Sequence, residues 1–262
     1  MLQLKNLYKT FNRNTPYEKQ LYAGLNLKVE KGDFITIIGS NGAGKSTLFK
    51  MITNSIEIDD GSILFGSDDT TYYKEFQTAK RVSSVVQDPK MGTVSGMTVF
   101  ENLAMAEIKG KKATLKFCLQ SQRRTYYSEL LSQFHLGLED KLEVRTELLS
   151  GGQRQVLSLL MATLNIPKLL LLDEHTAALD PKTSEKVMEI TEQVVTQNGL
   201  TCMMITHKLE DAIRYGNRLI MIHEGQVLMD IRGKEKESLD IQTLLSKYKK
   251  VKSSLSDRQL FS

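Results

Sequence analysis

The sequence contains few of the residues that build disulfide-linked or zinc-binding folds. Only two cysteines occur among 262 residues, Cys118 and Cys202, and neither belongs to a CxxC pair. Such widely separated cysteines support neither a disulfide framework nor a zinc site. We therefore expect both side chains to be reduced structural thiols.

Long apolar runs are also missing. The N-terminus, MLQLKNLYKTF, has no basic segment followed by an apolar one, as a secretory signal would. No apolar stretch reaches the roughly 18 residues that a membrane-spanning helix needs. The nearest candidate, VLSLLMATLNIPKLLLL, is interrupted by Asn165, Pro167 and Lys168. We expect the chain to be soluble and cytoplasmic.

A strong charge of one sign is absent as well. The 35 basic residues exceed the 31 acidic ones by only +4. This small excess creates no strong field toward nucleic acid, and no nucleic-acid partner is expected. The hydrophobic content of 40%, in contrast, supports a well-buried core. The length suits one large α/β domain or a domain with an inserted subdomain.

Two kinds of pattern alternate along the chain. Short β-rich runs and turns fill the first third, whereas three segments with apolar residues near a 3.6-residue period follow, over 97–108, 125–136 and 151–164. Strands and helices then alternate again, and RLIMIHEGQVLMD predicts two strands around a turn at Glu224 and Gly225. An α/β core interrupted by a helical insertion is therefore predicted, with a last short helix from near Ser238 and a polar tail.

The stretch GSNGAGKST fits the pattern GxxxxGK[ST] at every fixed position, between the β-like FITII and a helical run. Its glycines let successive N–H groups point at one anion, and the start of the helix adds a favourable dipole. Lys45 can reach the β- and γ-phosphates, and Ser46 offers a hydroxyl to Mg²⁺. The predicted phosphate-binding residues are Gly39, Ser40, Asn41, Gly42, Ala43, Gly44, Lys45, Ser46 and Thr47.

The stretch KLLLLDE supplies a second part of a nucleotide site. It predicts a buried parallel strand that delivers Asp173 and Glu174 at its C-terminal end, where ligands lie in such sheets. Asp173 would support Mg²⁺, and Glu174 would orient or deprotonate water. Taken alone, the stretch is equally compatible with plain core followed by a solvated turn. The phosphate loop in the same chain favours the functional interpretation.

The stretch LSGGQ predicts a second anion-binding site, at the start of a helix. Ser150 is a good N-cap, and Gly151 and Gly152 permit close backbone approach at the start of a helix, ahead of Gln153. A phosphate loop covers only one side of a triphosphate, so a second set of donors can close the outer face of the γ-phosphate. Without the other motifs, these five residues would be interpreted as an ordinary helix start.

The phosphate loop, LSGGQ and the acid-tipped strand, in this order, resemble the ATP-binding cassette (ABC) ATPases over nearly the whole chain. The resemblance implies a Mg²⁺-dependent ATPase coupled to transport. Its fold class would be α/β: a P-loop NTPase core, with a RecA-like sheet and an antiparallel β subdomain, and an inserted α-helical subdomain. One ABC domain would cover 1–240, with its core at 1–91 and 166–240 and its helical subdomain at about 92–165. A C-terminal helix and polar tail would cover 241–262.

In ABC ATPases two subunits pack head to tail. The resemblance thus implies ATP-dependent pairing with a second copy of this chain. The signature of one copy, Ser150 to Gln153, would close on the ATP that the other copy holds. This arrangement explains why one chain has two anion-binding segments, the phosphate loop and LSGGQ.

Further residues match the family pattern in order. Gln87, in RVSSVVQDP, matches the glutamine that touches Mg²⁺ or water and contacts the transport partner. Asp180, in AALD, matches the loop that crosses the dimer interface, and His207 matches the histidine that grips the γ-phosphate and keeps Glu174 placed. Phe11 sits where the family has the aromatic ring that stacks on adenine. Tyr17 is an alternative, and Phe11 could instead belong to the core.

The sequence also departs from the family. The family usually has proline after the catalytic glutamate, where this chain has His175, and RQVLSLLMAT replaces a commoner arginine-containing stretch. Together GQRQ, LLMATL and DEHTAALDP resemble a subgroup of bacterial uptake systems linked to amino acids, aromatic ones among them. Such a system implies integral membrane permease subunits, a substrate-binding lipoprotein and a peripheral place on the cytoplasmic face of the cell membrane.

Three other functions are to be weighed. An exporter subunit shares every ATPase residue with an importer. A non-transport ABC protein that acts on DNA or ribosomes typically has a long coiled coil in the insertion or two cassettes in tandem, and neither is seen here. A P-loop kinase or nucleotide switch would not need LSGGQ.

A basic cluster in the helical region has two interpretations. It either contacts anionic lipid headgroups or the permease subunits, or it is a solvated helical face. Its members are Lys109, Lys111, Lys112, Lys116, Arg123 and Arg124.

Overall fold

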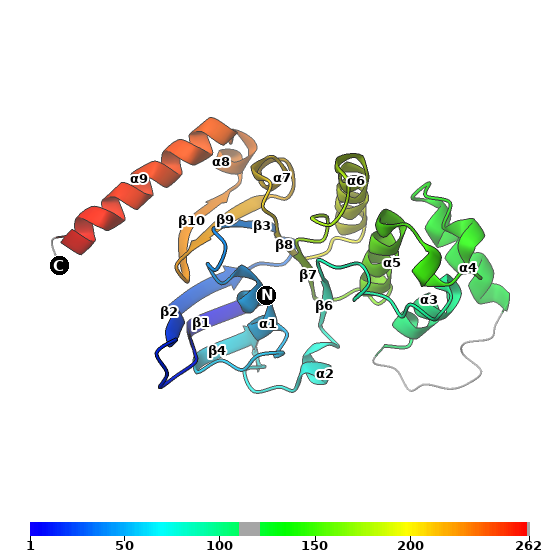
Figure 1. Ribbon diagram of the computed structural model, residues 1–262, viewed down its shortest axis with the longest axis horizontal. Helices are drawn as coiled ribbons and strands as arrows, with labels where there is room; N and C mark the ends of the chain where they lie inside the picture. Colours follow the sequence, from blue (N-terminus) through cyan, green and yellow to red (C-terminus); the bar gives the residue numbers. More distant parts are fainter. Residues whose placement is uncertain (110–120, 261–262) are drawn as a thin grey trace. The chain divides into compact units, whose positions relative to one another are not determined.

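The computed structural model describes residues 1–109 and 121–260, with the backbone alone for residue 121 and for 251–260 (Figure 1). It divides into two compact units. Unit 1 consists of Met1–Glu75 and Met203–Ser262, and unit 2 of Phe76–Cys202. The predicted boundaries between a core and a helical subdomain stay a prediction.

Unit 1 contains an antiparallel sheet with the strand order β2-β1-β4-β5. Its first strand alternates inward leucines, Leu2 and Leu4, with polar residues, because one face of the sheet is buried and the other is more open. The strands are β1 (Leu2–Phe11), β2 (Lys19–Val29), β4 (Asp60–Phe65) and β5 (Asp68–Asp69).

A second set of strands in unit 1 has the order β10-β9-β3-β8, and β3 and β9 run parallel. All five residues of β3 are buried, which explains the unbroken apolar run FITII. The strands are β3 (Phe34–Ile38), β8 (Cys202–Ile205), β9 (Arg218–His223) and β10 (Gln226–Arg232). The helices of unit 1 are α1 (Lys45–Ile52), α7 (Leu209–Arg214), α8 (Lys234–Glu237) and α9 (Ile241–Leu260).

The hairpin predicted around Glu224 and Gly225 is confirmed as β9 and β10. Both loop residues have positive φ, 46° and 72°, as a two-residue type I′ turn requires. The short helix predicted to start near Ser238 starts instead at Ile241, and it continues to Leu260 through most of the predicted polar tail. The reason is local: the Asp240 carboxylate accepts a hydrogen bond from the Thr243 N–H at 2.6 Å and caps the helix there.

The guanidinium of Arg218 joins several strands of unit 1. It donates to both carboxylate oxygens of Asp230 on β10 at 2.7 Å. It also donates to Asp33 and to the Lys28 carbonyl of β2, both at 2.8 Å. Its side chain is only 3% exposed, so these partners offset the cost of burying a charge.

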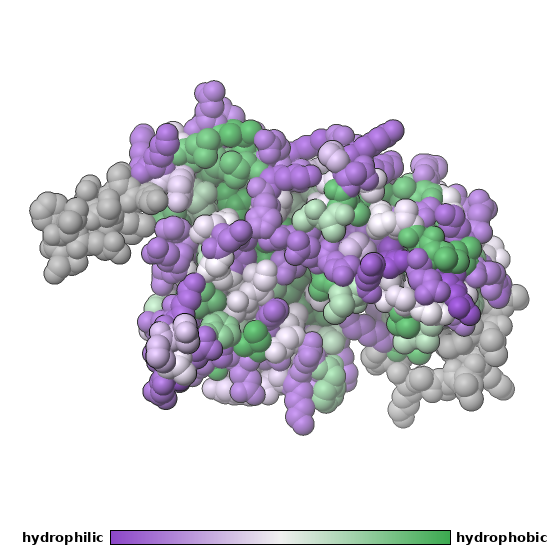
Figure 2. Space-filling view, in the orientation of Figure 1, coloured by the Kyte–Doolittle hydropathy of each residue, from purple (hydrophilic) through white to green (hydrophobic). Residues whose placement is uncertain are grey.

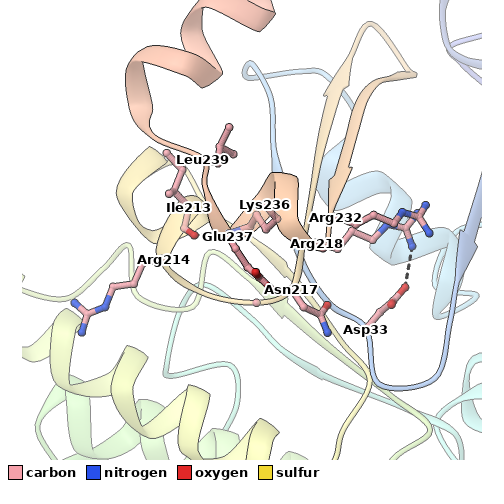
Figure 3. Close-up of a pocket in the computed structure, with 11 residues that line it drawn as sticks. Asp33, Ile213, Arg214, Asn217, Arg218, Arg232, Lys236, Glu237 and Leu239 are labelled. Carbon is pink, nitrogen blue, oxygen red and sulfur yellow. Dashed lines mark hydrogen bonds and ion pairs between the residues drawn. The ribbon is translucent and has the colours of Figure 1, made fainter.

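Arg218 lines a hollow of about 810 Å³ in unit 1, and Figure 3 shows the residues around it. One ion pair joins two charged groups of its lining, Arg218 and Asp33, and the dashed line in Figure 3 marks it. Lys236 is buried and donates to the carbonyls of Ile213 and Tyr215, which end α7. Arg218 and Lys236, two of the cations at this hollow, are therefore engaged in contacts within unit 1.

An apolar cluster supports the start of α9 in unit 1. Leu239 and Leu244 are buried in it with β9 and β10 residues, and Leu209, Ile213 and Tyr248 pack against its edge only partly buried. Figure 2 shows the resulting apolar surface over α7, α8 and the start of α9. The helix therefore rests on the sheet through its first turns.

Unit 2 is mainly helical. The helices predicted over 97–108 and 151–164 are confirmed as α3 (Val99–Glu107) and α5 (Gly151–Thr163). The helix predicted over 125–136 is found as α4 (Ser121–Ser132), which ends four residues earlier because the chain turns at His135, whose φ is 52°. A parallel pair, β6 (Val82–Val85) and β7 (Leu169–Asp173), and the amphipathic α6 (Pro181–Gln197) complete its long elements. The shorter elements are α2 (Glu75–Thr78), at the unit boundary, and the 3₁₀ turns Glu139–Lys141 and Thr146–Leu148.

Cys202 is a buried free thiol, and burial raises its pKa, as expected for a structural cysteine. Cys118 lies outside the described residues. Within 1–109 and 121–260, none of the helices combines the length and the apolar character that a membrane crossing requires.

Candidate functional site

The predicted phosphate loop of unit 1 runs from the end of β3 to the first turn of α1. Its backbone needs glycine twice, because Gly42 has a φ of 77° and Gly44 a φ of 106°. A Cβ on Gly39 would overlap the Ile222 carbonyl of β9, so this glycine permits close packing on the sheet. The N-cap of α1 is Gly44, which makes no side-chain capping hydrogen bond.

Lys45 curls back over this loop. Its side chain is buried, and Nζ donates to the carbonyls of Gly39 at 2.7 Å and Ser40 at 3.1 Å. The loop carbonyls thus hold the ammonium at the mouth of the cradle. A cation in this place can meet an anion that the loop N–H groups bind.

Unit 1 also brings His207 to the loop. Gly39, Ser40 and His207 line one cavity of about 200 Å³, together with Leu244 and Tyr248 of α9. The segment before His207 is attached to β3, because the Thr206 N–H donates to the Ile37 carbonyl at 3.1 Å. Two sequence-predicted parts of the site therefore lie side by side.

The two candidates for adenine stacking differ in exposure. Phe11, the last residue of β1, is half-buried, and the ammonium of Lys9 lies 5.5 Å from its ring centroid. Tyr17 is 80% exposed. Lys9 is itself paired with Asp59 at 3.1 Å. Both rings belong to unit 1, as the phosphate loop does.

The acid-tipped strand of unit 2 is β7. Its four leucines are buried, and Asp173 and Glu174 follow at its half-exposed end. Glu174 has a φ of 49°, which is rare for a residue with a Cβ and is often retained at functional sites. The structure therefore sets Glu174 on a sharp turn directly after Asp173.

His175, the departure from the family pattern, points into the protein. It is buried, and its Nε2 lies 3.0 Å from the Thr191 hydroxyl on α6. Because Thr191 donates its one hydroxyl hydrogen to the Val187 carbonyl at 2.8 Å, His175 Nε2 must donate. Burial lowers the pKa of His175 to about 4, so the ring is neutral at neutral pH. His175 anchors the turn after Glu174 to α6.

The signature segment begins α5 with a capping box, which confirms Ser150 as the N-cap. Ser150 Oγ accepts from the Gln153 N–H at 3.3 Å, and Gln153 Oε1 accepts from the Ser150 N–H at 3.2 Å. Gln153 also donates to the Leu136 carbonyl at 2.9 Å. This segment is held by its own residues and by the loop at Leu136.

Asp180 lies next to the signature segment within unit 2. A Cβ on Gly152 would overlap Cγ2 of Thr183, and a Cβ on Gly151 would approach Leu179 to 3.2 Å. The two glycines therefore let the start of α5 pack against the start of α6. Asp180 caps α6 by accepting from the Thr183 N–H at 3.1 Å, and its own side chain is exposed.

Gln87 follows β6 and is exposed. Its segment is tied to α5, since Gln155 Nε2 lies 3.5 Å from the Val86 carbonyl and a Cβ on Gly92 would overlap the Ser158 hydroxyl. Sequence reasoning missed Gln155 and Ser158. The available signal was two polar residues, three positions apart, on the otherwise apolar face of a helix.

The predicted magnesium ligands are divided between the units, with Ser46 in unit 1 and Gln87 and Asp173 in unit 2. No group of three or more His, Cys, Asp or Glu side chains could hold a metal ion by itself in the described ranges. A serine hydroxyl, an amide oxygen and a carboxylate are nevertheless the hard oxygen ligands that Mg²⁺ accepts beside phosphate oxygens.

Three members of the basic cluster, Lys111, Lys112 and Lys116, lie outside the described residues. The other three have partners within unit 2. Arg123 pairs with Glu107, and Arg124 pairs with Glu143 and lies 4.8 Å from the ring centroid of Phe100. Lys109 Nζ lies 3.4 Å from the Ser83 hydroxyl, and burial lowers the pKa of Lys109.

The chain is similar to known proteins along most of its length. A family profile described as ABC transporter matches residues 22–177. A tyrosine transport ATP-binding protein of Clostridioides difficile is 46% identical, over 95% of this chain and 98% of that protein. A phosphonates import ATP-binding protein of Oceanobacillus iheyensis is 31% identical, over 88% of this chain and 89% of that protein. A solved dimeric ATP-binding cassette in a post-hydrolysis state, bound to ADP and Pi, superposes with a TM-score of 0.75 at 26% identity, over 88% of this chain and 98% of that one.

Proposed function

The chain belongs to the ABC transporter family as an ATP-hydrolysing, ATP-binding subunit, and from this membership we propose that it powers the import of an aromatic amino acid. The observation that carries the proposal is the similarity, over almost the full length of both chains, to a tyrosine transport ATP-binding protein. Tyrosine is therefore the first substrate to test.

The features of the phosphate loop in unit 1 suit the binding of a nucleoside triphosphate. No side chain in the described ranges caps α1, and Lys45 Nζ is held by two loop carbonyls at the mouth of the loop. Backbone N–H groups and one ammonium thus converge on the place where an anion binds. Magnesium held by Ser46, Gln87 and Asp173 would neutralise phosphate charge. Phe11 or Tyr17 would stack on the adenine.

We assign the chemical step to Glu174, with His207 gripping the γ-phosphate and Gln87 beside the attacking water. General-base assistance contributes about 10²- to 10⁴-fold to a rate. Glu174→Gln keeps the size of the side chain and removes the base, so turnover should fall by about this factor. ATP binding should persist in a filter or fluorescence assay. Hydrolysis at the wild-type rate by this variant would exclude Glu174 as the base.

The signature residues Ser150, Gly151, Gly152 and Gln153 would close on the ATP of a second copy, with Asp180 at the same interface. The solved dimeric cassette with ADP and Pi supports the pairing of two copies, and the head-to-tail arrangement is part of our proposal. Sedimentation of Glu174→Gln with ATP and Mg²⁺ tests it: a dimer is expected with ATP and a monomer without. A monomer in both conditions, also in the presence of the permease subunits, would contradict it.

Transport requires partners that cross the membrane. We propose integral permease subunits, a substrate-binding lipoprotein and a peripheral position on the cytoplasmic face of the membrane. The exposed segment at Gln87 and the cavity of about 310 Å³ lined by Met97, Phe100 and Met105 are candidate contacts for the permease within unit 2. Copurification with membrane proteins rather than with ribosomes or DNA is expected.

Uptake by the assembled transporter tests the substrate. Radiolabelled tyrosine should enter proteoliposomes when ATP is on the side of this subunit, and Glu174→Gln should stop it. Excess phenylalanine competing better than methionine or a phosphonate would support an aromatic preference. ATP-dependent efflux instead of uptake would establish the alternative, an exporter. Competition by a phosphonate alone would place the chain with the phosphonate importers.

A further inference from the structure

Tyr22 is a buried polar residue that belongs to none of the sequence motifs. It lies on β2 with 0% of its surface exposed, and its hydroxyl donates to the Gly44 carbonyl at 2.8 Å. Gly44 immediately precedes Lys45 in the phosphate loop. We infer that Tyr22 is a positioning residue, which orients the last peptide of the loop for nucleotide binding. The inference rests on the proposed nucleotide site at this loop.

The peptide between Gly44 and Lys45 carries the effect. It is trans and planar, so its C=O and N–H point in opposite directions. A hydroxyl that fixes the Gly44 carbonyl therefore also fixes the Lys45 N–H. This N–H lies in the first turn of α1, among the donors that a helix start offers to an anion. Tyr22 thus aims one donor of the cradle without touching the ligand.

The hydrogen bond from Tyr22 matters because Gly44 is more flexible than a residue with a side chain would be. Its φ of 106° lies in a region that only glycine visits easily, and no side chain in the described part of the chain caps α1. Because glycine moves between backbone conformations at little cost, the peptide could turn away from the ligand. The Gly44 carbonyl already accepts from the Leu48 N–H at 2.8 Å, and Tyr22 adds a second, non-helical restraint.

The ring of Tyr22 fills the space beside this peptide. A Cβ on Gly44 would lie 2.5 Å from the hydroxyl oxygen and 2.8 Å from ring carbon Cζ. Tyrosine and glycine at these two positions therefore fit each other. Burial raises the pKa of Tyr22, so the hydroxyl keeps its proton and stays a donor at neutral pH.

The backbone of Tyr22 is itself held from two sides. The register between β1 and β2 shifts between Lys9 and Thr10, which leaves Leu21 as an extra residue on β2. Bulges of this kind re-aim neighbouring side chains. The turn between β9 and β10 packs closely against the backbone of Leu21, because a Cβ on Gly225 would overlap the Leu21 carbonyl. The antiparallel sheet therefore offers a firm base from which Tyr22 reaches the loop.

Tyr22→Phe tests the inference because it removes one oxygen and keeps the ring. Loss of a neutral hydrogen bond should raise the Kd for a fluorescent ATP analogue, and the KM for ATP, by about 2- to 12-fold. The kcat at saturating ATP should stay unchanged, since Glu174 and water are not affected. Both constants are to be measured well below the melting temperature, which is recorded for each variant.

Tyr127→Phe is the matched control. Tyr127 is 1% exposed, and its hydroxyl bonds to Glu107 at 2.5 Å, but both residues belong to unit 2. This variant should lose thermal stability while its KM for ATP stays at the wild-type value. If Tyr22→Phe behaves in the same way, with lower stability and unchanged ATP affinity, Tyr22 has only a structural role and the inference is wrong.

Lys45→Ala separates this failure from a failure of the proposed site. If the wild type does not bind ATP, or if Lys45→Ala binds it equally well, the phosphate loop is not the nucleotide site. If Lys45→Ala loses binding and Tyr22→Phe weakens it with unchanged kcat, both the site and the role of Tyr22 are supported.

Discussion

The two glycine-bearing helix starts of this chain are stabilised in opposite ways. At α1, the N-cap is Gly44, which lies in the left-handed region and makes no side-chain capping bond. At α5, Ser150 and Gln153 form a reciprocal capping box. The first start has no cap from the side chain of its N-cap residue, whereas the second satisfies part of its donors with its own side chains.

This difference suits the two proposed tasks. A loop that wraps a triphosphate must offer many N–H groups, so a side chain that competes for them would weaken binding. The signature segment, in contrast, is proposed to contact only the outer face of the γ-phosphate of the ATP that a second copy holds. It therefore needs few donors but a fixed shape. The capping box uses an acceptor site of the Ser150 hydroxyl and leaves its hydrogen for the anion.

Among the variants that test this difference between the starts of α1 and α5, Ser150→Asp should have the largest effect. Aspartate caps a helix as well as serine does, but it has no hydrogen to donate and repels phosphate. Hydrolysis should fall by about 10²- to 10³-fold, the loss seen when one donor of a charge-stabilising site is removed. The melting temperature should stay near that of the wild type.

Ser150→Asn provides the matched control for this change. Asparagine also caps well, carries no charge and can donate through its amide. It should retain more activity than Ser150→Asp. Equal activity of the aspartate variant and the wild type would show that Ser150 acts as a helix cap and does not face an anion.

Gly44→Ala tests the other helix start. The new Cβ would meet the Tyr22 ring at 2.8 Å and hold a φ of 106° that L residues avoid. A strain of about 1–3 kcal/mol corresponds to about 5- to 150-fold weaker ATP binding if it is relieved by moving the loop. Titration with a fluorescent ATP analogue measures the loss.

Gly66→Ala is the control for left-handed strain elsewhere. Gly66 has a φ of 68° in the turn between β4 and β5, and no atom lies within 4 Å of a Cβ placed there. This variant should lose stability but bind ATP normally. Weakened binding by both variants would mean that the loss reflects general destabilisation of unit 1.

The sequence predicted the parts of this site that are contiguous. The N-cap at Ser150 and the helix α5 are confirmed, and both follow from residues that are neighbours in the chain, so local rules were sufficient. The phosphate-binding role of the loop before α1 rests on the same kind of local pattern and stays a prediction. The α/β class followed from the same local alternation. The role of Glu174 was inferred from the acidic end of the predicted strand together with the phosphate loop, and that of His207 from the family pattern; both stay predictions.

The contacts that sequence reasoning missed join residues far apart in the chain. Tyr22 bonds to Gly44 across 22 positions, and Gln155 to Val86 across 69. His175 bonds to Thr191 on the next helix, 16 positions later. Each depends on how two elements pack in space, and the contact of Tyr22 also depends on the register shift that leaves Leu21 as an extra residue on β2. A pattern of residue types carries no register, so these partners could not be derived.

Gly152→Ala sharpens the comparison in the signature segment. Gly152 has an ordinary helical backbone, and the obstacle to a side chain is Cγ2 of Thr183. Overpacking should lower the free energy of unfolding by about 1–3 kcal/mol. Thr183→Ser removes only this methyl group, so the double variant should recover most of the loss in urea unfolding. A double variant as unstable as Gly152→Ala would mean that the backbone of α5, not the contact with Thr183, requires glycine.

The start of α6 offers a third comparison, because its N-cap Asp180 carries a charge. Replacing Asp180 should change the free energy of unfolding least among the variants considered. Hydrogen bonds from Thr183 hold the pKa of Asp180 below its usual value. A lowered pKa in the folded state means that Asp180 stabilises the fold fully above the pKa of unfolded aspartate, about 3.9, and that this contribution is lost as the pH falls further. Asp180→Asn keeps a cap that does not titrate. Urea unfolding from pH 7 to pH 3 should therefore show a difference between the two proteins that shrinks below about pH 4. A difference that stays constant over this range would mean that the charge of Asp180 adds nothing to the cap, and that the starts of α5 and α6 are stabilised in the same neutral way.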